Sequence, residues 1–243
     1  MPNPKLIDVY ELPTVENICN QVLREVISLP KVSMAHVTMS PGNTSLLHQH
    51  SKMSEVYFIL EGKGILYYGN KALEVEKNVY YVLPENTSHK LKNTGTSNLE
   101  HLVLAIPPFD PDDVNLLKDT LNEPILKKFK HEKTPIIALD GALIYELISG
   151  NKRKRLDVAL AVGFLPQKRK AIPHYHKISE EIYYVTSGIG EVHVGEKAFK
   201  IQKGSVIYIP INKVHALENK SDTELRVLCV SSPAYTEGDF IFK

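Results

Sequence analysis

The sequence predicts an all-β protein made of two β-barrels in tandem, joined by short helices. Apolar runs of four to eight residues alternate with turns rich in Gly, Asn, Pro and Ser, as in 64–68, 79–83 and 102–106, which is typical of barrel strands. The sequence also matches itself at an offset of 126 residues. A chain of 243 residues accommodates two such copies, and each copy, at roughly 100 residues, then has the usual size of a domain.

The composition is that of an ordinary globular protein, with 43% hydrophobic and 23% charged residues. The formal net charge of +1 gives no reason to expect nucleic acid or an acidic membrane surface as a partner. The chain starts without a signal-peptide pattern, and no apolar run approaches the ~20 residues that span a bilayer, so we expect a cytoplasmic protein. Its two cysteines, Cys19 and Cys229, are expected to be buried, reduced thiols.

The repeat is the most informative feature of the sequence. Shifting the chain by 126 residues superposes His48 on His174, and the register then holds without a gap as far as Pro107 and Pro233. Upstream, 37–41 matches 162–166 at an offset of 125, which predicts one extra residue before the histidines of the second copy. Other pairs superposed at 126 are His50 and His176, Glu55 and Glu181, Gly62 and Gly188, Pro84 and Pro210, His89 and His215, and Asn93 and Asn219. Chance does not align so many special residue types, so the chain is a tandem duplication.

The expected domains are an N-terminal barrel over 1–109, a helical linker over 110–134 and a C-terminal barrel over 135–243. Asp110 is placed to cap the linker helix and Pro111 to occupy its first position. Apolar residues then recur at helical spacing as far as Leu121. A second short helix is predicted over 14–24.

Two histidines and a glutamate in the first copy indicate a metal site. His48 and His50 lie two positions apart, so on a strand they face the same side. Glu55 follows five positions after His50 and would face away on an unbroken strand, so a turn over 51–54 must fold two adjacent strands back on each other. Two imidazoles and a carboxylate that converge in this way suit Mn, Fe, Co, Ni, Cu or Zn.

These motifs resemble those of the cupin family, in its two-domain or bicupin form. The first cupin motif, G-x5-HxH-x3,4-E-x6-G, is matched in full by Gly42, His48, His50, Glu55 and Gly62. The second motif, G-x5-PxG-x2-H-x3-N, is matched by Pro84, His89 and Asn93, with Asn78 and Asn86 in place of its glycines. Asn is the next most tolerant residue after Gly for a positive φ, so these replacements are mild.

The second copy matches both motifs with one larger departure. Lys168 stands where the first motif begins with glycine, which leaves the form of the entry loop of the second barrel open but affects no ligand, and Asn212 replaces one glycine of the second motif. The matching residues are His174, His176, Glu181 and Gly188 in the first motif, and Gly204, Pro210, His215 and Asn219 in the second. The resemblance therefore covers nearly the whole chain.

The resemblance implies two jelly-roll-like cupin barrels, each with one divalent transition-metal ion. The implied ligands are His48, His50, Glu55 and His89 in the first barrel, and His174, His176, Glu181 and His215 in the second. These ligand types leave the metal open between Fe, Mn, Ni, Zn, Co and Cu. Four protein ligands on an ion that prefers six leave two positions, enough for a bidentate substrate such as a 2-oxo acid, an enediol or a catechol, or for a substrate plus dioxygen.

The function expected of such sites is a metal-dependent enzyme that acts on a small polar, anionic metabolite. A non-haem dioxygenase-type oxidoreductase is the first candidate, and an isomerase or lyase that works through a metal-bound enediolate is the alternative. A non-catalytic sugar- or metabolite-binding cupin is the third. The partner is then a small molecule, and the protein is expected to be a monomer or a homodimer.

Several further residues have a candidate role. Tyr57 and Tyr183 lie two residues past the glutamates and so face the same side, either as catalytic proton donors or as barrel core. The basic residues 168–170 precede the second pair of histidines, and we hypothesise that they draw an anionic substrate to the second site. His101 and His193 have no histidine at the repeat offset, so no ligand role shared by the two copies is expected of them.

Overall fold

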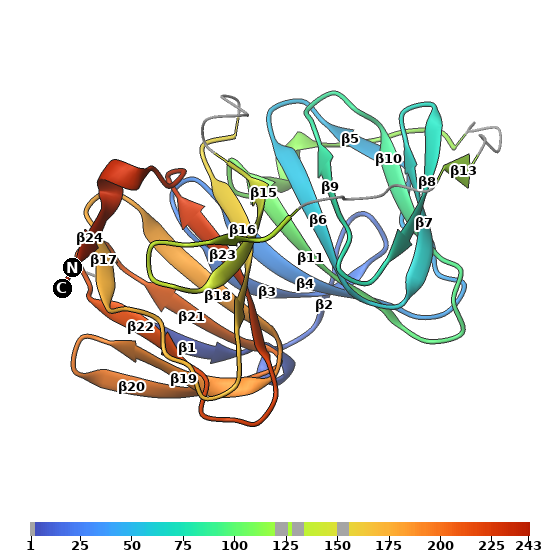
Figure 1. Cartoon of the computed structure of the whole chain (residues 1–243). Helices are drawn as coiled ribbons and strands as arrows, with labels where there is room; N and C mark the ends of the chain where they lie inside the picture. Colours follow the sequence, from blue (N-terminus) through green and yellow to red (C-terminus); the bar gives the residue numbers. More distant parts are fainter. Residues whose placement is uncertain (1–2, 120–125, 128–133, 150–155) are drawn as a thin grey trace. The chain divides into compact units, whose positions relative to one another are not determined.

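The computed structural model describes residues 3–119, 126–127, 134–149 and 156–243. Strands dominate this part of the chain (Figure 1), and its helical elements are three 3-10 turns: η1 (Val9–Glu11), η2 (Pro111–Asp113) and η3 (Glu237–Asp239). The all-β prediction is therefore confirmed. No helix in the described ranges is long and apolar enough to cross a membrane.

The chain divides into two compact units. The first spans Leu12–Glu132, and the second combines Met1–Glu11 with Lys133–Lys243. The N-terminal residues belong to the second unit because β1 (Lys5–Asp8) pairs antiparallel with β21 (Ser205–Ile209). The first eleven residues of the expected N-terminal barrel over 1–109 therefore belong to the other barrel. An edge strand of that barrel supplies their backbone hydrogen bonds.

Two six-stranded sheets form the first barrel, and its core fills the space between them. One sheet has the order β12-β5-β10-β7-β8-β13, with β5 (His48–His50), β7 (Lys63–Tyr68), β8 (Lys71–Glu76), β10 (His89–Asn93), β12 (Val114–Leu116) and β13 (Leu126–Lys127). The other has the order β2-β3-β4-β11-β6-β9, with β2 (Val15–Glu16), β3 (Val22–Ser28), β4 (Ser33–Met39), β6 (Ser54–Glu61), β9 (Tyr80–Leu83) and β11 (Leu99–Ile106). Both sheets contribute to the core, for example through Val37, Ile59, Leu66 and Leu91.

The second barrel has one seven-stranded and one five-stranded sheet. The larger sheet has the order β1-β21-β18-β23-β16-β15-β14, with β14 (Ile136–Ile137), β15 (Leu143–Ile148), β16 (Ala159–Leu165), β18 (Glu180–Ser187) and β23 (Leu225–Ser232). The smaller has the order β20-β19-β22-β17-β24, with β17 (His174–His176), β19 (Ile189–Val194), β20 (Lys197–Gln202), β22 (His215–Glu218) and β24 (Phe240–Phe242). Its core again joins the two sheets, through residues such as Val185, Val192, Ile207 and Leu217.

The strand registers follow the sequence repeat at a single offset. Met39 of β4 pairs with Leu99 of β11, and Leu165 of β16 pairs with Leu225 of β23. Each member of the second pair lies 126 positions after its counterpart. The offset of 125 expected for 37–41 is therefore wrong. Strand pairing aligns the two copies at an offset of 126 in this segment, and the few identical residues at 125 do not reflect equivalent positions.

The turns of the two copies have the same backbone conformation despite their different residues. Lys168 adopts a φ of 57° where Gly42 of the first copy has 81°, and Asn78 adopts 67° where Gly204 of the second copy has 87°. The side chain of Lys168 therefore does not change the path of the entry loop, although this left-handed conformation is unusual for a lysine.

Both predicted helices are wrong. The linker helix ends after one turn: Asp110 caps it as expected, accepting a hydrogen bond from Asp112 N at 3.0 Å, and the chain then continues as β12. This strand pairs antiparallel with β5, and the hydrogen bonds offered by that sheet edge favour a strand over a helix. Residues 120–125 and 128–133 of the expected linker lie outside the described residues. Over 14–24, β2 and the start of β3 replace the second helix.

Candidate metal centres

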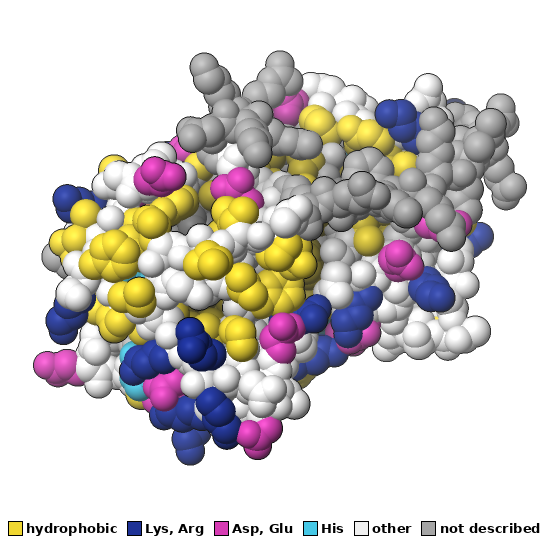
Figure 2. Space-filling view, in the orientation of Figure 1, with side chains coloured by type: hydrophobic (Ala, Val, Ile, Leu, Met, Phe, Trp, Pro, Cys, Tyr) yellow, Lys and Arg dark blue, Asp and Glu magenta, His cyan; other side chains and the backbone are white. Residues whose placement is uncertain are grey.

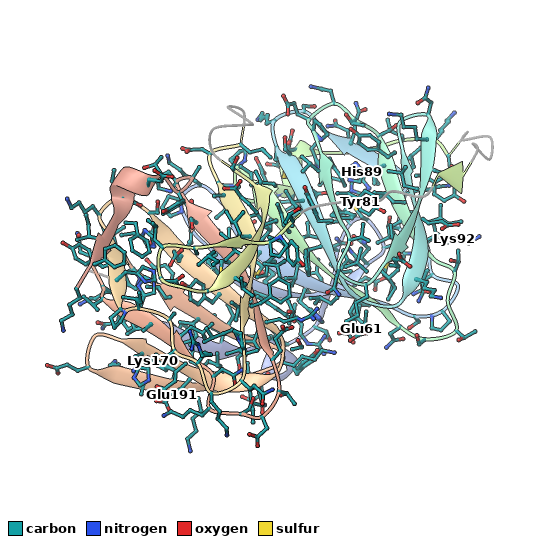
Figure 3. The ribbon with its side chains drawn as sticks, viewed as in Figure 1. Glu61, Tyr81, His89, Lys92, Lys170 and Glu191 are labelled. Carbon is teal, nitrogen blue, oxygen red and sulfur yellow. The ribbon has the colours of Figure 1, made fainter. Side chains whose placement is uncertain are left out.

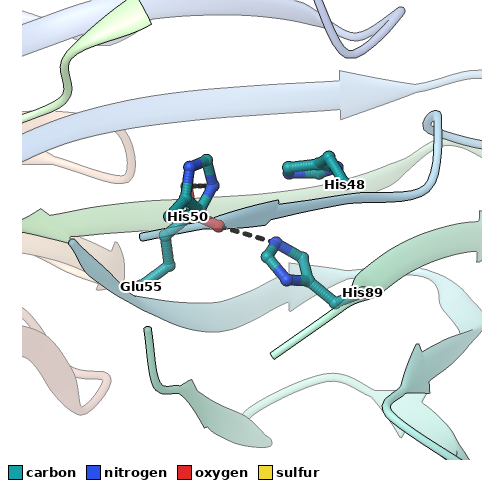
Figure 4. Close-up of side chains that lie close together, drawn as sticks. All are labelled: His48, His50, Glu55 and His89. Carbon is teal, nitrogen blue, oxygen red and sulfur yellow. Dashed lines mark hydrogen bonds and ion pairs between the residues drawn. The ribbon is translucent and has the colours of Figure 1, made fainter. Parts of the chain in front are cut away.

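Four side chains converge inside the first barrel (Figure 4). His48 and His50 extend from β5, Glu55 from β6 and His89 from β10, and His89 pairs directly with His48 across the two strands. All four residues are buried, and their ligand atoms lie within 4.8 Å of one another. The Glu55 carboxylate lies 3.1 Å from His89 Nε2 and 3.6 Å from His50 Nε2. The turn between β5 and β6 thus brings Glu55 to the histidines.

The second barrel repeats this arrangement with the residues at the 126-residue offset. His174 and His176 extend from β17, Glu181 from β18 and His215 from β22, and all four are buried. The Glu181 carboxylate lies 3.0 Å from His215 Nε2 and 3.5 Å from His176 Nε2. The structure therefore brings together both groups of four residues that the motifs indicated.

Backbone carbonyls determine which ring nitrogen of each histidine faces the centre of its cluster. The Nδ1 atoms of four histidines contact the carbonyl oxygen two residues earlier: His48 with Leu46 at 2.7 Å, and His89 with Thr87, His174 with Ile172 and His215 with Lys213, each at 2.9 Å. Because a carbonyl oxygen only accepts hydrogen bonds, Nδ1 must carry the proton. The Nε2 lone pair is then free to bind a metal ion.

Several inward-facing atoms lack a hydrogen-bond partner. Among the described residues, His50 Nε2, His215 Nε2 and Glu181 Oε2 are buried without one, whereas nearly all buried polar atoms in proteins are paired. Lone pairs that face one another with no donor between them fit a cation, and imidazole with carboxylate suits a divalent transition metal. The donor set therefore fits a metal ion.

Burial and the neighbouring side chains together set the pKa values in the clusters. Burial, together with the neighbouring His89, lowers the pKa of His48 to about 4, and burial also lowers the pKa of His174 to about 4. Both imidazoles are therefore neutral at pH 7, as metal ligation requires. Burial alone would raise the pKa of Glu55, but the imidazoles of His50 and His89 hold it well below its usual range.

A buried aspartate that the sequence analysis did not single out holds the turn of the first cluster. The carboxylate of Asp113 accepts hydrogen bonds from the backbone N–H groups of Ser51, Lys52 and Met53 at 3.0 to 3.2 Å. The carbonyl oxygen of Asp113 also lies 3.2 Å from His50 Nδ1. Asp113 thus contacts both the turn that connects His50 to Glu55 and the imidazole ring of His50.

Asp239 has the same place in the second cluster, 126 residues later. Its carboxylate accepts hydrogen bonds from the N–H groups of Ile178 at 2.6 Å and Ser179 at 3.1 Å, and it lies 3.5 Å from His176 Nδ1. The repeat offset relates Asp113 to Asp239, so the sequence contained a signal for both residues. The expectation of a linker helix over 110–134 hides this signal, because Asp113 lies in that segment.

Tyr57 and Tyr183 lie beside the clusters and within the barrel cores. The ring centre of Tyr57 is 5.9 Å from that of His89, and the ring centre of Tyr183 is 6.0 Å from that of His215. Burial, followed by the nearby glutamate, raises the pKa of each phenol well above its usual value. Each phenol therefore keeps its proton at neutral pH, and a catalytic role stays a prediction.

Each cluster faces a cavity. The first cavity has a volume of about 780 Å³ and is lined by His48, His50 and Glu55. The second has a volume of about 280 Å³ and contains the corresponding ligands in its wall. Cys19 lines the first and Cys229 the second, and both are free thiols as expected.

The proposed role of residues 168–170 is not supported. They are absent from the described lining of the second cavity. Lys168 Nζ instead lies 3.0 Å from an oxygen of Asp222, and Lys170 Nζ lies 3.4 Å from an oxygen of Glu218. These lysines are paired with acids outside the cavity, and an attraction of substrate by residues 168–170 stays a prediction.

Glu191, His193 and Glu218 form a third group of candidate ligands, which is only partly buried. Figure 3 labels Lys170 and Glu191 at this end of the second barrel, and Figure 2 shows basic, acidic and histidine side chains gathered there. Lys220 Nζ lies 3.1 Å from an oxygen of Glu191, and Lys170 pairs with Glu218. Because ammonium groups already neutralise both carboxylates, we assign this group as an ion-pair network.

Comparison with known proteins agrees with the two clusters. The cupin domain family matches residues 35–105 and again residues 161–231. The chain belongs to the cupin family. As a bicupin, it carries one complete set of His, His, Glu and His ligands in each matched domain.

Relatives of this bicupin have been found both by sequence and by structure. An uncharacterized protein of Methanocaldococcus jannaschii is 36% identical over 115 residues, which are 47% of this chain and 92% of that protein. The oxalate-binding protein of Thermotoga maritima is 31% identical over 72 residues, 30% of this chain and 60% of that protein. The oxalate decarboxylase of Lactobacillus farciminis in its formate complex has a TM-score of 0.74 at 16% identity, covering 100% of this chain and 89% of that one. The last likeness is one of fold.

Proposed function

We propose that this bicupin is a metal-dependent enzyme that acts on a small anionic metabolite, with one divalent transition-metal ion in each barrel. The observation that carries the proposal is the pair of buried ligand sets, in which inward-facing atoms such as His50 Nε2, His215 Nε2 and Glu181 Oε2 have no hydrogen-bond partner among the described residues. The proposed ligands are the four residues of each cluster: His48, His50, Glu55 and His89, and His174, His176, Glu181 and His215.

The ligand set also favours an anionic substrate. Three neutral imidazoles and one carboxylate leave a divalent ion with a net charge near +1, which favours an anionic oxygen ligand. A bound ion supplies a Lewis acid, an orienting template or a route for electrons to dioxygen. Tyr57 and Tyr183 keep their protons and border the clusters, so we assign them the donation of a proton, or a hydrogen bond, to the substrate oxygen.

Three reaction classes follow. The first candidate is the dioxygenase-type oxidation expected from the sequence, because two coordination positions accommodate a substrate and dioxygen. The second is a lyase, which is favoured by the similarity to an oxalate-binding protein and by the shared fold of the oxalate decarboxylases. An isomerase that works through an enediolate requires the same two positions. A non-catalytic cupin would bind the ligand without turnover.

Metal content tests the sites themselves. Protein purified without an affinity-nickel step is expected to contain, or to take up, two equivalents of a divalent transition metal. His89→Ala and His215→Ala are each expected to lose one equivalent, whereas the control His193→Ala, in the ion-pair network, is expected to keep both. A wild-type protein that binds no metal would overturn the proposal.

Turnover tests separate the reactions. Protein loaded anaerobically with Fe(II) or Mn(II) is mixed with 2-oxo acids, thiols, catechols and oxalate, and dioxygen uptake and carbon dioxide release are followed. Dioxygen uptake supports the oxidation. Carbon dioxide release without net uptake supports the lyase, and a change of substrate with neither supports the isomerase. Ligand binding without any turnover would refute the enzyme and leave a binding protein.

A further inference from the structure

The wall beside the metal ligands differs between the barrels. In the first barrel, Glu55 pairs with Ala105, and Tyr57 pairs with Val103, which in turn pairs with Ala35. Residues paired in this way share one face of a sheet, and all five line the first cavity. An apolar surface therefore begins at the carboxylate ligand and extends across β11 to β4.

The equivalent wall of the second barrel is more polar beside its glutamate, although apolar side chains such as Ile136, Ile137 and Leu139 line the rest of that cavity. Ser231 pairs with Glu181, and Cys229 pairs with Tyr183, at the positions of Ala105 and Val103 in the repeat. The hydroxyl group of Ser231 donates a hydrogen bond to the Glu181 carboxylate at 3.1 Å, a contact that an alanine cannot make.

The first cavity continues this apolar character to its mouth. Val37 and Leu23 line it further in, and Ile18 and Phe109 line it while remaining 52% and 43% exposed. Large apolar side chains held at the surface are available to contact a ligand. At about 780 Å³ against about 280 Å³, this cavity leaves more room for the body of a ligand than the second one does.

The charges at the first cavity are negative. Glu16 and Glu25 are exposed and line it together with the ligand Glu55, and no Lys or Arg occurs among the described residues of its lining. A second carboxylate on a substrate would meet these acids instead of a cation. The charge of the metal centre is thus best matched by one anionic head group.

We propose that the first site takes a monoanionic chelating acid with an apolar body, such as a branched-chain or aromatic 2-oxo acid, and that the second site does not share this preference. The inference rests on the proposed function, since the metal ion holds the head group. The apolar body lies along Ala35 and Val103 and extends toward Phe109. Small dianions are disfavoured at this site.

The test compares three probes on wild-type protein with Mn(II) in both sites: pyruvate, 4-methyl-2-oxopentanoate and oxalate. Each buried methylene tightens binding by about fourfold, so the three additional carbons of the branched acid are expected to lower its dissociation constant at least ~10-fold relative to pyruvate. Calorimetric titration is expected to find this preference at one site per chain, with oxalate weaker than the branched acid there.

Two matched variants locate the preference. Ala35→Leu fills the first cavity and is expected to remove the preference for the branched acid. Ala161→Leu, at the equivalent position that lines the second cavity, is expected to leave that preference in place. If Ala35→Leu does not fold, Val103→Thr keeps the shape of the wall while adding a hydroxyl, and is expected to weaken the branched acid but not pyruvate.

Failure of this inference is distinguishable from failure of the proposed function. Equal affinity for pyruvate and the branched acid, or tighter binding of oxalate at the first site, would overturn the inference and leave the metal-dependent function standing. Binding of none of the three acids to the metal-loaded protein would overturn the inference alone, whereas a protein that takes up no metal would overturn both. Loss of the preference in Ala161→Leu instead of Ala35→Leu would assign the apolar substrate to the other barrel and refute the inference.

Discussion

Replacing Asp113 by Asn is expected to weaken the first metal centre without removing any ligand. The two carboxylate oxygens of Asp113 accept four contacts from the N–H groups of Ser51, Lys52 and Met53. Asn has one carbonyl oxygen, so its amide nitrogen must face at least one of these donors. Hydrogen bonds to a charged group contribute about 1.5–3 kcal/mol each, and we expect a loss of about 2 kcal/mol in the free energy of unfolding of the metal-free protein.

The functional effect follows from the position of the turn. Ser51, Lys52 and Met53 connect His50 to Glu55, so a loosened turn lets two ligands move apart. Loss of an outer partner of metal ligands typically costs about 10–100-fold in affinity, and Asp113→Asn is expected to lower the affinity of one of the two sites by that factor.

The assay is a titration with Mn(II), in which the free ion is measured by its electron paramagnetic resonance signal, combined with urea unfolding of the metal-free protein. Asp112→Asn is the control, because it removes the same charge from the adjacent, exposed position; it is expected to leave both sites and the stability unchanged. Unchanged Mn(II) affinity in Asp113→Asn, or an equal loss in Asp112→Asn, would refute the proposed role of the turn.

Three further predictions concern stability. Burial lowers the pKa of His101 to about 3, against about 6.5 in an unfolded chain, so between these values only the unfolded state takes up the proton and the stability falls as the pH falls. His101→Val is expected to remove about 2 kcal/mol of the stability that the wild type loses between pH 7 and pH 5, measured by urea unfolding at both pH values. An unchanged dependence of stability on pH in this variant would contradict the prediction. A Cβ at Gly190 would lie 2.6 Å from the carbonyl oxygen of Glu218, whereas a Cβ at Gly238 would meet nothing within 4 Å. Gly190→Ala should therefore cost about 1–3 kcal/mol of unfolding free energy, and Gly238→Ala almost none. Equal melting temperatures of the two variants would count against the described strand register. Removing metal with a chelator should lower the melting temperature, because a ligand present at a hundred times its dissociation constant stabilises the folded state by about 2.7 kcal/mol; a melting temperature that does not respond to chelator would show that the folded state does not depend on the metal.

The sequence by itself determined the parts of the site that depend on local pattern. The alternation of His48 and His50, the turn before Glu55 and the repeat at 126 residues predict two clusters in two barrels. This is because the period of a strand decides which side chains share a face. His89 and His215 came from the motif alone, and the structure places them opposite His48 and His174.

The tertiary structure decided what depends on contacts between distant segments. Residues 5–8 form an edge strand of the second barrel, and residues 114–116 form a strand beside β5 in place of a helix. Asp113 lies some sixty residues from the turn that it holds. Ala105 and Ser231 can be read from the sequence, but only the pairing of β11 with β6 and of β23 with β18 shows that they lie beside Glu55 and Glu181. Local preference is weak compared with the hydrogen bonds and burial that a whole sheet offers, and those become available only when the barrel closes.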